Sequence, residues 1–407
     1  MSAHDSVWIT GAGCVSPLGK SPAQLIDRAL AGHSGIRQVT RFPVTNHPSQ
    51  IAAYLDDVPA PLGWDEAEFA TRPLSEKIVL WCAIQALRDA GLWDERSRYR
   101  IGLVLGVGAE WLTTWTLNME DANAILQSAQ DEEVGLTARS FEALGIAGPS
   151  TTVAAACASG NYALGVGRQW VRQGLVDVCL AGGVEFAVSA MGLAGFGNLG
   201  ALSRRNADPP RASRPFDSGR DGFVMGEGGA LMVLESASHA RRRGVAGRGE
   251  IAGFGASSDA FHAVIPSDDP APAARAIDAA LRDAQVAPSE VDYINAHATS
   301  TPVGDVHETK ALGLVFGDEV RRVSISSTKS MTGHALSAAS ALEALLCLGA
   351  LERQVVPPTI NLEDVDPQCA HLNHVRNVAR EQRVNVAISN SFGFGGANTC
   401  VVLRKAA

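Results

Sequence analysis

Three residues of this 407-residue sequence, Cys157, His297 and His334, could together carry out acyl-transfer chemistry. A cysteine thiolate is a strong nucleophile that accepts an acyl group as a thioester. Two neutral histidines near it could hold the charge that develops on a neighbouring carbonyl oxygen. Each residue type alone is more often structural than catalytic, because free cysteines are commonly buried and inert. The local setting of each residue therefore decides whether the hypothesis stands.

Cys157 lies in the segment TTVAAACASG (151–160), where a β-prone stretch runs into a predicted helix. At the start of a helix, unpaired N–H groups and the helix dipole lower the pKa of a thiol, so we expect a thiolate near neutral pH. The backbone N–H of this cysteine could also face a developing oxyanion. The other six cysteines are scattered and mostly lie in apolar surroundings, so they are expected to be reduced, buried thiols: Cys14, Cys82, Cys179, Cys347, Cys369 and Cys400.

Both histidines follow predicted strands, which is where ligands bind in α/β sheets. His297 ends a strand predicted over 291–297 and opens the polar turn HATSTPVGD. His334 follows a second predicted strand through the segment SSTKSMTGH and lies at or near the start of a long apolar helix. Because a helix N-terminus disfavours the imidazolium, we expect His334 to remain neutral and able to donate a hydrogen bond.

Two charged residues, Lys329 and Glu308, are expected to be buried near these histidines. Charged side chains are buried only when they are paired. They form either a structural ion pair or a pair that fixes the orientation of His334, and we favour the second role. The glycine-rich turn NSFGFGGAN (390–398) joins two predicted strands and exposes backbone N–H groups, one of which could complete an oxyanion hole facing Cys157.

Phosphate, metal and nucleic-acid ligands fit the sequence less well. No lysine and no helix follow the glycine-rich turn, and GAG at 11–13 lacks the third glycine of a dinucleotide site. The segment CAHLNH (369–374) lacks the second ligand pair of a zinc site, so no metal is expected. The net charge of −9 argues against a nucleic-acid partner. The basic run HARRR (239–243) is expected to be a solvated helix end, with an acidic carrier protein as the alternative ligand.

The elements that must position these residues alternate between short β-branched runs and longer helical segments, a pattern typical of a largely parallel sheet covered on both faces. Strands are predicted over 7–15, 101–107, 150–156, 177–184, 228–235, 249–256, 291–297, 322–326, 384–390 and 398–404. Helices are predicted over 21–32, 74–91, 121–144, 158–174, 236–243, 270–286, 304–316 and 334–352. The alternation restarts after Gly244, which predicts two α/β halves that share one core and one site.

The composition is that of an ordinary globular protein, with 46% hydrophobic and 19% charged residues. The sequence starts without the basic and apolar leader of a secretory signal, and no later segment approaches the roughly 18 apolar residues of a membrane span. We therefore expect a cytoplasmic protein that does not enter a membrane.

Taken together, these motifs resemble the ketoacyl synthase family of the thiolase-like fold, especially the elongating β-ketoacyl-[acyl carrier protein] synthases of type II fatty acid and polyketide pathways. The similarity spans nearly the whole chain, and the motifs occur in family order: VWITGAGCVSPLG, AACASG, ALSRRNADPPRASRPFDSGRDGFVMGEGGALMVLE, SSDAFH, HATSTPVGD, STKSMTGH and NSFGFGGAN. The resemblance implies an α/β fold with five αβαβα layers, built from two similar halves. Residues 1–245 would carry the cysteine, and residues 246–407 would carry the two histidines.

The resemblance also implies a reaction. An acyl carrier protein would acylate Cys157, and His297 and His334 would activate a malonyl thioester, whose decarboxylation gives the carbanion for a Claisen condensation. Substrates would be carried on phosphopantetheine, so no metal or redox cofactor is implied. The remaining implied site residues are Phe394 as gate and oxyanion-hole N–H, Thr299 and Thr301 on pantetheine, Lys329, Glu308 and Asp305 as support, and Ala109 and Phe196 in the acyl pocket.

Several residues depart from the family pattern. Ala298 stands where glycine is usual, Ser337 and Ser340 interrupt a glycine-bearing run, and Gly200 replaces an arginine expected on the carrier-docking surface. Ala109 is smaller than the residue expected in the acyl pocket of housekeeping enzymes. The acyl chain, the carrier and the pathway therefore stay open, and we favour a specialised fatty acid-like or polyketide pathway. A dimer is implied, either with itself or with a related ketosynthase-like subunit.

Three alternatives compete with this interpretation. A non-catalytic partner subunit that sets chain length would lack the nucleophile, whereas this chain has it. A degradative thiolase or a priming synthase would show a Cys-His-Cys or Cys-His-Asn set, which the second histidine disfavours. A purely structural α/β protein would need no cysteine and histidines at the junctions between loops and helices.

Overall fold

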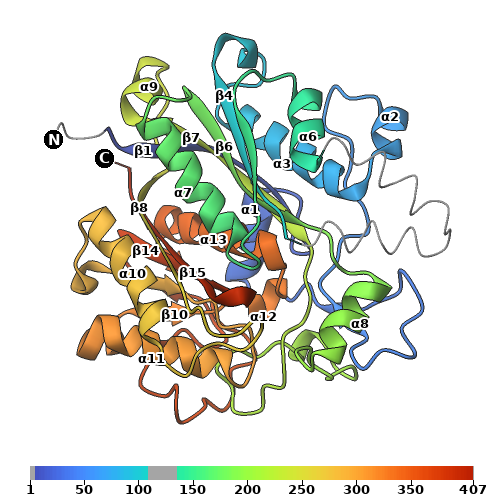
Figure 1. The fold of residues 1–407 in the computed structure, drawn as a ribbon, viewed down its shortest axis with the longest axis vertical. Helices are drawn as coiled ribbons and strands as arrows, with labels where there is room; N and C mark the ends of the chain where they lie inside the picture. The colour runs from blue at the N-terminus through green and yellow to red at the C-terminus, as the bar shows by residue number, and fades with distance from the viewer. Residues whose placement is uncertain (1–4, 109–134, 407) are drawn as a thin grey trace.

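A mixed sheet of eleven strands runs through the molecule (Figure 1). The structure is a computed structural model that describes residues 5–108 and 135–406. From one edge to the middle, the strands are β5 (Ser150–Val153), β4 (Ile101–Gly106), β6 (Val178–Glu185), β7 (Gly228–Ser236) and β1 (Val7–Val15). The order continues with β8 (Gly249–Ser258), β15 (Ala397–Arg404), β14 (Val386–Gly393), β9 (Tyr293–Asn295), β10 (Ser324–Ser326) and β12 (Asn373–His374).

The centre of the sheet corrects the prediction of a largely parallel sheet. Strands near the two edges are parallel to their neighbours, but each pair from β6 across to β14 is antiparallel. The pair β14 and β15 shows the reason, because only the short turn at residues 394–396 connects them. Such a tight turn reverses the chain, whereas parallel strands need a long crossover.

Helices in three layers alternate with the two halves of the sheet. The helices α7 (Ser159–Arg172) and α13 (Ala339–Arg353) pack against each other and against strands of both halves. On the outside, α3 (Leu74–Asp89) covers β1 and β7, and α10 (Ala271–Ala284) covers β8 and β15 (Figure 1). The arrangement confirms the α/β class and the five layers. Because α13 is enclosed by both halves, it is apolar and buried all round, unlike a surface helix.

The predicted helices are mostly confirmed, but one boundary is corrected and three described helices were not predicted. The helix predicted over 334–352 begins only at Ala339. The glycine-rich helix α8 (Ala190–Asn198) was not predicted, since glycine is a weak helix former. Of the helix predicted over 121–144, the described part is α6 (Leu136–Leu144). The helices α1 (Pro22–Leu30), α9 (Ala237–Arg242) and α11 (Gly304–Phe316) lie within their predicted ranges, whereas α2 (Glu66–Thr71) and the short α12 (Lys329–Thr332) were not predicted.

The glycines of the GAG segment serve the packing of α3 on β1. A Cβ atom at Gly11 would lie 2.3 Å from the carbonyl oxygen of Ala86, and one at Gly13 would lie 2.1 Å from that of Cys82. Real Cβ atoms never approach backbone so closely. These two glycines therefore let the helix lie directly on the strand.

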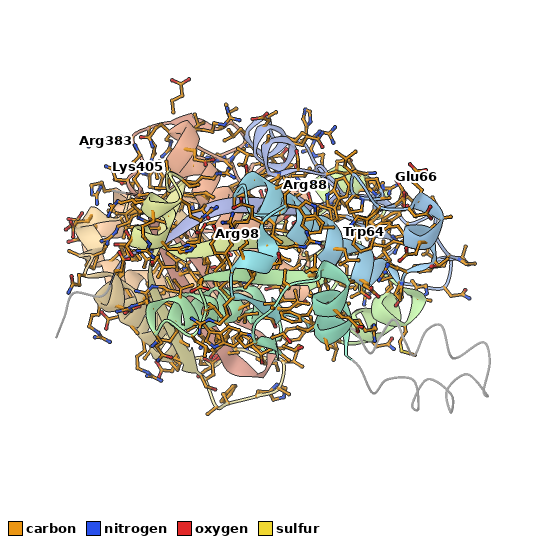
Figure 2. All side chains as sticks on the ribbon, turned by 90° about the horizontal axis from the view of Figure 1, so that it is seen from above. Trp64, Glu66, Arg88, Arg98, Arg383 and Lys405 are labelled. Atoms are coloured by element: carbon orange, nitrogen blue, oxygen red, sulfur yellow. The ribbon has the colours of Figure 1, made fainter. Side chains whose placement is uncertain are left out.

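The surface carries charged side chains such as Arg98, Arg383 and Lys405, which project outward in Figure 2. The basic run at 239–243 falls at the end of α9, as predicted for a helix end. Two of its members bind the buried Glu235, with 2.6 Å to His239 Nδ1 and 2.9 Å to Arg243 Nε. These contacts give the run a structural role and correct the expectation of a solvated run, because the His239 and Arg243 side chains are mostly buried. No helix within residues 5–108 and 135–406 has the length and apolar character needed to cross a membrane.

Candidate active site

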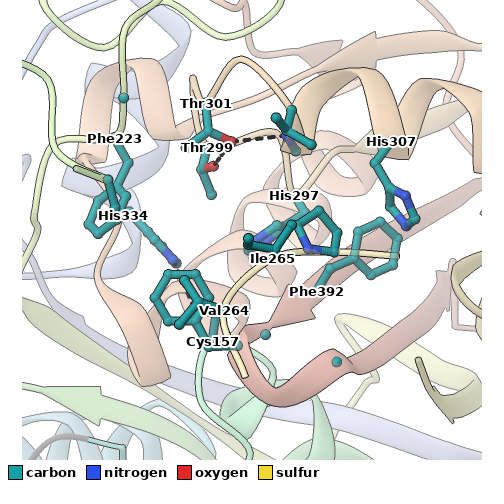
Figure 3. Close-up of a pocket in the computed structure, with 18 of the residues that line it drawn as sticks. Cys157, Phe223, Val264, Ile265, His297, Thr299, Thr301, His307, His334 and Phe392 are labelled. Atoms are coloured by element: carbon teal, nitrogen blue, oxygen red, sulfur yellow. Dashed lines mark hydrogen bonds between the residues drawn. The ribbon is translucent and has the colours of Figure 1, made fainter. Parts of the chain in front are cut away.

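Cys157, His297 and His334 meet on the wall of one cavity (Figure 3). The Nε2 atom of His334 lies 3.0 Å from the Sγ atom of Cys157. The two imidazole rings lie edge to face, with centroids 5.4 Å apart and an interplanar angle of 84°. One donor atom from each of the three residues lies within 4.8 Å of the other two. The sequence prediction that these residues form one site is consistent with this geometry.

The cavity has a volume of about 300 Å³ and a largely apolar wall. Thr299 and Thr301 add hydroxyl groups to this wall, and their Oγ1 atoms lie 3.1 Å apart. Its other lining residues include Gly200, Phe223, Val264, Ile265, Val303, Leu336, Phe392 and Phe394. Some of these side chains, such as Ile265 and Val303, are more than half exposed, so the cavity reaches the surface. A long, thin substrate could enter from solvent and reach the thiol.

A tight turn places Cys157 between β5 and α7. Ala156 before it has φ of 47°, a left-handed conformation that is strained for a residue with a Cβ atom. The Ser159 hydroxyl stabilises the turn by donating to the Ala156 carbonyl oxygen at 2.7 Å and accepting from the Ala155 N–H at 2.9 Å. From β14, the Ser391 hydroxyl donates to the Cys157 carbonyl oxygen at 2.8 Å. The cysteine is therefore held by elements from both halves of the sheet.

Burial raises the pKa of the Cys157 thiol to about 12, which corrects the prediction of a resting thiolate. The side chain is only 5% exposed, and α7 starts two residues later, so desolvation outweighs the effect of the helix start. The charge of Lys329 and a hydrogen bond from the Phe394 backbone lower this pKa, but by less. The resting residue is a neutral thiol whose nearest proton acceptor is His334.

Burial lowers the pKa values of both His297 and His334 well below the ordinary 6.5, and the positive charge of Lys329 lowers them further. Both imidazoles are therefore neutral at pH 7. For His334 the prediction of a neutral ring holds, but its cause is burial, because α13 begins five residues after it. The backbone of His334 is fixed by its N–H, which donates to the Val224 carbonyl oxygen at 2.7 Å.

Glu308 and Asp305, both on α11, fix the loop that carries His297. The Glu308 carboxylate accepts from the backbone N–H groups of His297 at 3.0 Å and Ala298 at 2.7 Å. Asp305 accepts from the N–H of Ser300 at 3.1 Å and lies 3.5 Å from the Arg220 guanidinium. Glu308 thus acts on the first histidine, whereas the sequence analysis assigned it to the second.

Lys329 pairs with Glu343 on α13, and both side chains are buried. This pair corrects the prediction that Lys329 pairs with Glu308. Glu343 was missed because it lies in the apolar run ASALEALLCLGAL of the central helix. A single acidic residue inside such a run is itself a signal, since a buried carboxylate needs a cationic or hydrogen-bonded partner.

Replacing Lys329 with methionine is expected to reduce the free energy of unfolding by about 3–5 kcal/mol, because Glu343 would be left buried without its partner. Burial already raises the pKa of Glu343 to about 7, above its value in the unfolded chain. At low pH the buried carboxyl group is protonated and neutral, whereas at higher pH it carries a charge that the variant leaves unpaired. The variant should therefore lose more stability at pH 8 than at pH 5. Urea unfolding at both pH values measures the effect.

The matched control is the double variant Lys329→Met/Glu343→Leu, which removes both charges. It should recover most of the lost stability, since replacing a whole buried pair by apolar residues is often neutral. A single variant as stable as the unchanged protein would contradict the importance of the pair.

Phe394 and Phe196 lie near the thiol in different ways. Phe394 lines the cavity. Phe196 on α8 is not a lining residue but packs near Phe394, with the two ring centroids 6.3 Å apart. Phe196 also packs edge to face on Phe223 at 5.7 Å. Ala109, the other residue predicted for the acyl pocket, lies outside the described residues. His307 lines the same cavity and was missed, because it lies within α11 rather than at a strand end.

The departures Ser337 and Ser340 have structural partners. The Ser337 hydroxyl is 2.7 Å from the Val184 carbonyl oxygen and 2.8 Å from a carboxylate oxygen of the buried Glu185. The Ser340 Oγ accepts from the backbone N–H of Asn161 at 3.0 Å. Both serines therefore tie the segment after His334 to the other half of the sheet and to α7.

Comparison with known proteins identifies two matching family models. The model described as "Beta-ketoacyl synthase, N-terminal domain" matches residues 4–240, and "Beta-ketoacyl synthase, C-terminal domain" matches residues 248–363. Together they cover most of the chain, including all three residues that meet in the cavity.

Similar proteins come from two kinds of pathway. The chain is 39% identical over 415 residues to "3-oxoacyl-[acyl-carrier-protein] synthase 2" of Coxiella burnetii, which covers 98% of each chain. It is 37% identical to "Tetracenomycin polyketide synthase ketoacyl synthase alpha subunit" of Streptomyces glaucescens, covering 99% of this chain and 98% of the relative. Among solved structures, "The ishigamide ketosynthase/chain length factor" superposes with a TM-score of 0.87 and 33% identity over the whole of both chains.

Proposed function

The chain belongs to the beta-ketoacyl synthase family, and on this premise we propose that it is a 3-oxoacyl-[acyl carrier protein] synthase. It is an acyltransferase that condenses an acyl group on Cys157 with a malonyl group delivered by a carrier protein. The observation that carries the proposal is the 3.0 Å contact between Cys157 Sγ and His334 Nε2 on a cavity wall that also holds His297. The alternative of a non-catalytic partner subunit is not favoured, because nucleophile and histidines are all in place.

In the first half-reaction, the acyl group moves from the carrier's phosphopantetheine sulfur to Cys157. His334 accepts the thiol proton as the new C–S bond forms, and that proton leaves with the departing pantetheine thiol. The backbone N–H groups of Cys157 and Phe394 donate to the oxyanion of the tetrahedral intermediate. The lowering of the Cys157 pKa by the Phe394 backbone supports this role, because it indicates that the Phe394 N–H lies near the thiol.

In the second half-reaction, a malonyl thioester enters and loses carbon dioxide. The electron pair of the broken C–C bond forms an enolate. Its oxygen accepts hydrogen bonds from the neutral imidazoles of His297 and His334, and for His334 this requires the tautomer with the proton on Nε2, whereas the first half-reaction uses the tautomer with the proton on Nδ1. The enolate carbon attacks the thioester on Cys157, and the cysteine sulfur leaves as a thiolate that takes up a proton. The product is a 3-oxoacyl thioester that is two carbons longer. Neutral rings suit this step because they can donate hydrogen bonds to the enolate oxygen without carrying a permanent positive charge, which would also stabilise the bound substrate before it reacts.

The phosphopantetheine arm is proposed to lie along Thr299 and Thr301. Their hydroxyl groups line the path from the surface to the thiol and offer hydrogen bonds to the amides of the arm. The acyl chain is proposed to extend past Phe394 toward Phe196. Residues 1–245 and 246–407 are proposed as the two halves of a thiolase-like fold that share this site.

The proposed partners are an acyl carrier protein and a second ketosynthase subunit. The Coxiella relative is named for an acyl-carrier-protein substrate, and the ishigamide structure pairs a ketosynthase with a chain length factor. A homodimer or a heterodimer of this kind is therefore proposed. The reaction as written needs no metal or redox cofactor. The seven free cysteines support a cytoplasmic location, where thiols stay reduced.

Mass spectrometry of the intact protein, after incubation with carrier proteins bearing acyl chains of different length, tests the proposal. We expect one acyl group to be added per chain, on the peptide that contains Cys157, with the greatest occupancy for the preferred primer. A specialised fatty acid-like or polyketide pathway would show as a narrow length preference. Absence of any acyl adduct with every carrier would overturn the proposed function.

A further inference from the structure

The residues that meet in the cavity also form a ligand set suited to a soft metal ion. A thiol sulfur and two imidazole nitrogens are the donors that zinc prefers in proteins. The donor atoms of Cys157, His297 and His334 lie within 4.8 Å of one another, and no other group of three such side chains among the described residues meets this spacing. The three residues come from separate loops of the fold (Figure 3).

The spacing is close to what a tetrahedral ion requires. Zinc bonds of about 2.3 Å to sulfur and about 2.0 Å to nitrogen put ligand atoms roughly 3.3–3.6 Å apart. The distance from Cys157 Sγ to His334 Nε2 is 3.0 Å and would have to widen slightly, whereas any separation near the 4.8 Å limit would have to shorten by about 1 Å. The cavity beside the three residues leaves the fourth coordination position open to water.

We propose that the Cys157, His297 and His334 cluster binds one Zn²⁺ ion per chain, and that the bound ion reversibly blocks the thiol. The Cys157 S–H bond breaks as the Zn–S bond forms, the proton is released to solvent, and no oxidation state changes. The inhibitory consequence rests on the proposed function, because it is acyl transfer to this thiol that the ion prevents. The binding itself does not depend on that function.

Two features indicate an inhibitory ion rather than a resident one. The Nδ1 atoms of His297 and His334 have no hydrogen-bond partner among the described residues. In resident zinc sites, by contrast, the ring N–H that does not face the metal usually donates a hydrogen bond to a carboxylate or a carbonyl oxygen. The Lys329 ammonium also acts electrostatically on all three residues, although Glu343 pairs with it. Both features reduce affinity, so a chelator should remove the ion.

Cobalt substitution gives a test that is independent of catalysis. Added Co²⁺ should bind with a stoichiometry of one per chain and show a thiolate-to-cobalt charge-transfer band together with the intense visible bands of tetrahedral cobalt. Zn²⁺ should displace it, which gives the zinc affinity by competition. In parallel, Zn²⁺ should prevent acyl transfer to Cys157, and EDTA should restore it fully.

Two variants test proposed ligands, and a third serves as the control. Cys157→Ser should lose the charge-transfer band, and His334→Asn should weaken binding by at least about tenfold, the smallest loss typical even for groups behind a ligand. Cys369→Ala, which removes a buried thiol outside this cavity, should keep the full spectrum. Circular dichroism verifies that each variant is folded.

The outcomes separate the two proposals. An unchanged spectrum in Cys157→Ser, octahedral cobalt only, or no cobalt binding would each overturn the metal site, whatever the enzyme activity. A tetrahedral cobalt spectrum in a protein that no carrier acylates would uphold the metal site and overturn the proposed function.

Discussion

Changing Cys157 to glutamine is expected to abolish condensation while malonyl decarboxylation is retained or increased. Glutamine has no nucleophile, so transfer of the acyl group should fall by at least about three orders of magnitude. Its amide oxygen can occupy the place of the thioester carbonyl oxygen, close to the Phe394 backbone N–H that acts on the thiol. His297 and His334 stay in the cavity and can still stabilise the enolate from malonyl thioester.

Two assays separate these activities. Intact-protein mass spectrometry reports acyl transfer, and conversion of malonyl carrier protein to acetyl carrier protein reports decarboxylation. Cys157→Ala serves as the matched variant, because it removes the nucleophile without adding an amide, and it should also fail to accept an acyl group. Condensation that continues in either variant would show that a different residue is the nucleophile.

The two histidines are expected to differ when each is replaced with alanine. His334 Nε2 contacts the thiol at 3.0 Å, so His334→Ala should slow acyl transfer to Cys157 by about 10²–10⁴-fold, the usual effect of losing a general base. His297 has no hydrogen bond to the thiol among the described contacts, so His297→Ala should leave acyl transfer nearly unchanged. Both variants should slow decarboxylation by about 10²–10³-fold, because each loses a donor to the enolate oxygen.

Two measurements on the same preparations test this difference. Mass spectrometry monitors acylation in a single turnover, and a second assay measures the rate of decarboxylation. Thermal unfolding of each variant should be recorded as a control, since His334 is buried and His297 is half-buried. Equal losses of acyl transfer in the two variants would contradict the division of roles between the histidines.

The positions of these residues could be predicted because each depends on local sequence. His297 follows a β-prone run and opens a polar turn, and Cys157 stands where such a run meets a helix. The order of the motifs then indicated the family and its five layers. The same local signals placed most helices within two residues of their observed ends.

The protonation state of Cys157 and the partner of Lys329 could not be predicted in this way. Both depend on tertiary burial: the thiol is enclosed by segments far away in sequence, and Glu343 reaches Lys329 from the central helix. The antiparallel centre of the sheet was also missed. For β14 and β15 the short turn between the two predicted strands already indicates it, but for the other pairs, strands buried on both faces have similar apolar sequences whichever way their neighbours run.

The active site depends on the two central helices, α7 and α13, being packed between both halves of the sheet. The helix α7 starts beside the nucleophile, α13 supplies the partner of Lys329, and each packs against both halves of the sheet. The site is therefore complete only when both halves of the sheet and both central helices are packed together. Turnover by this protein should serve as an all-or-none reporter of a fully assembled molecule.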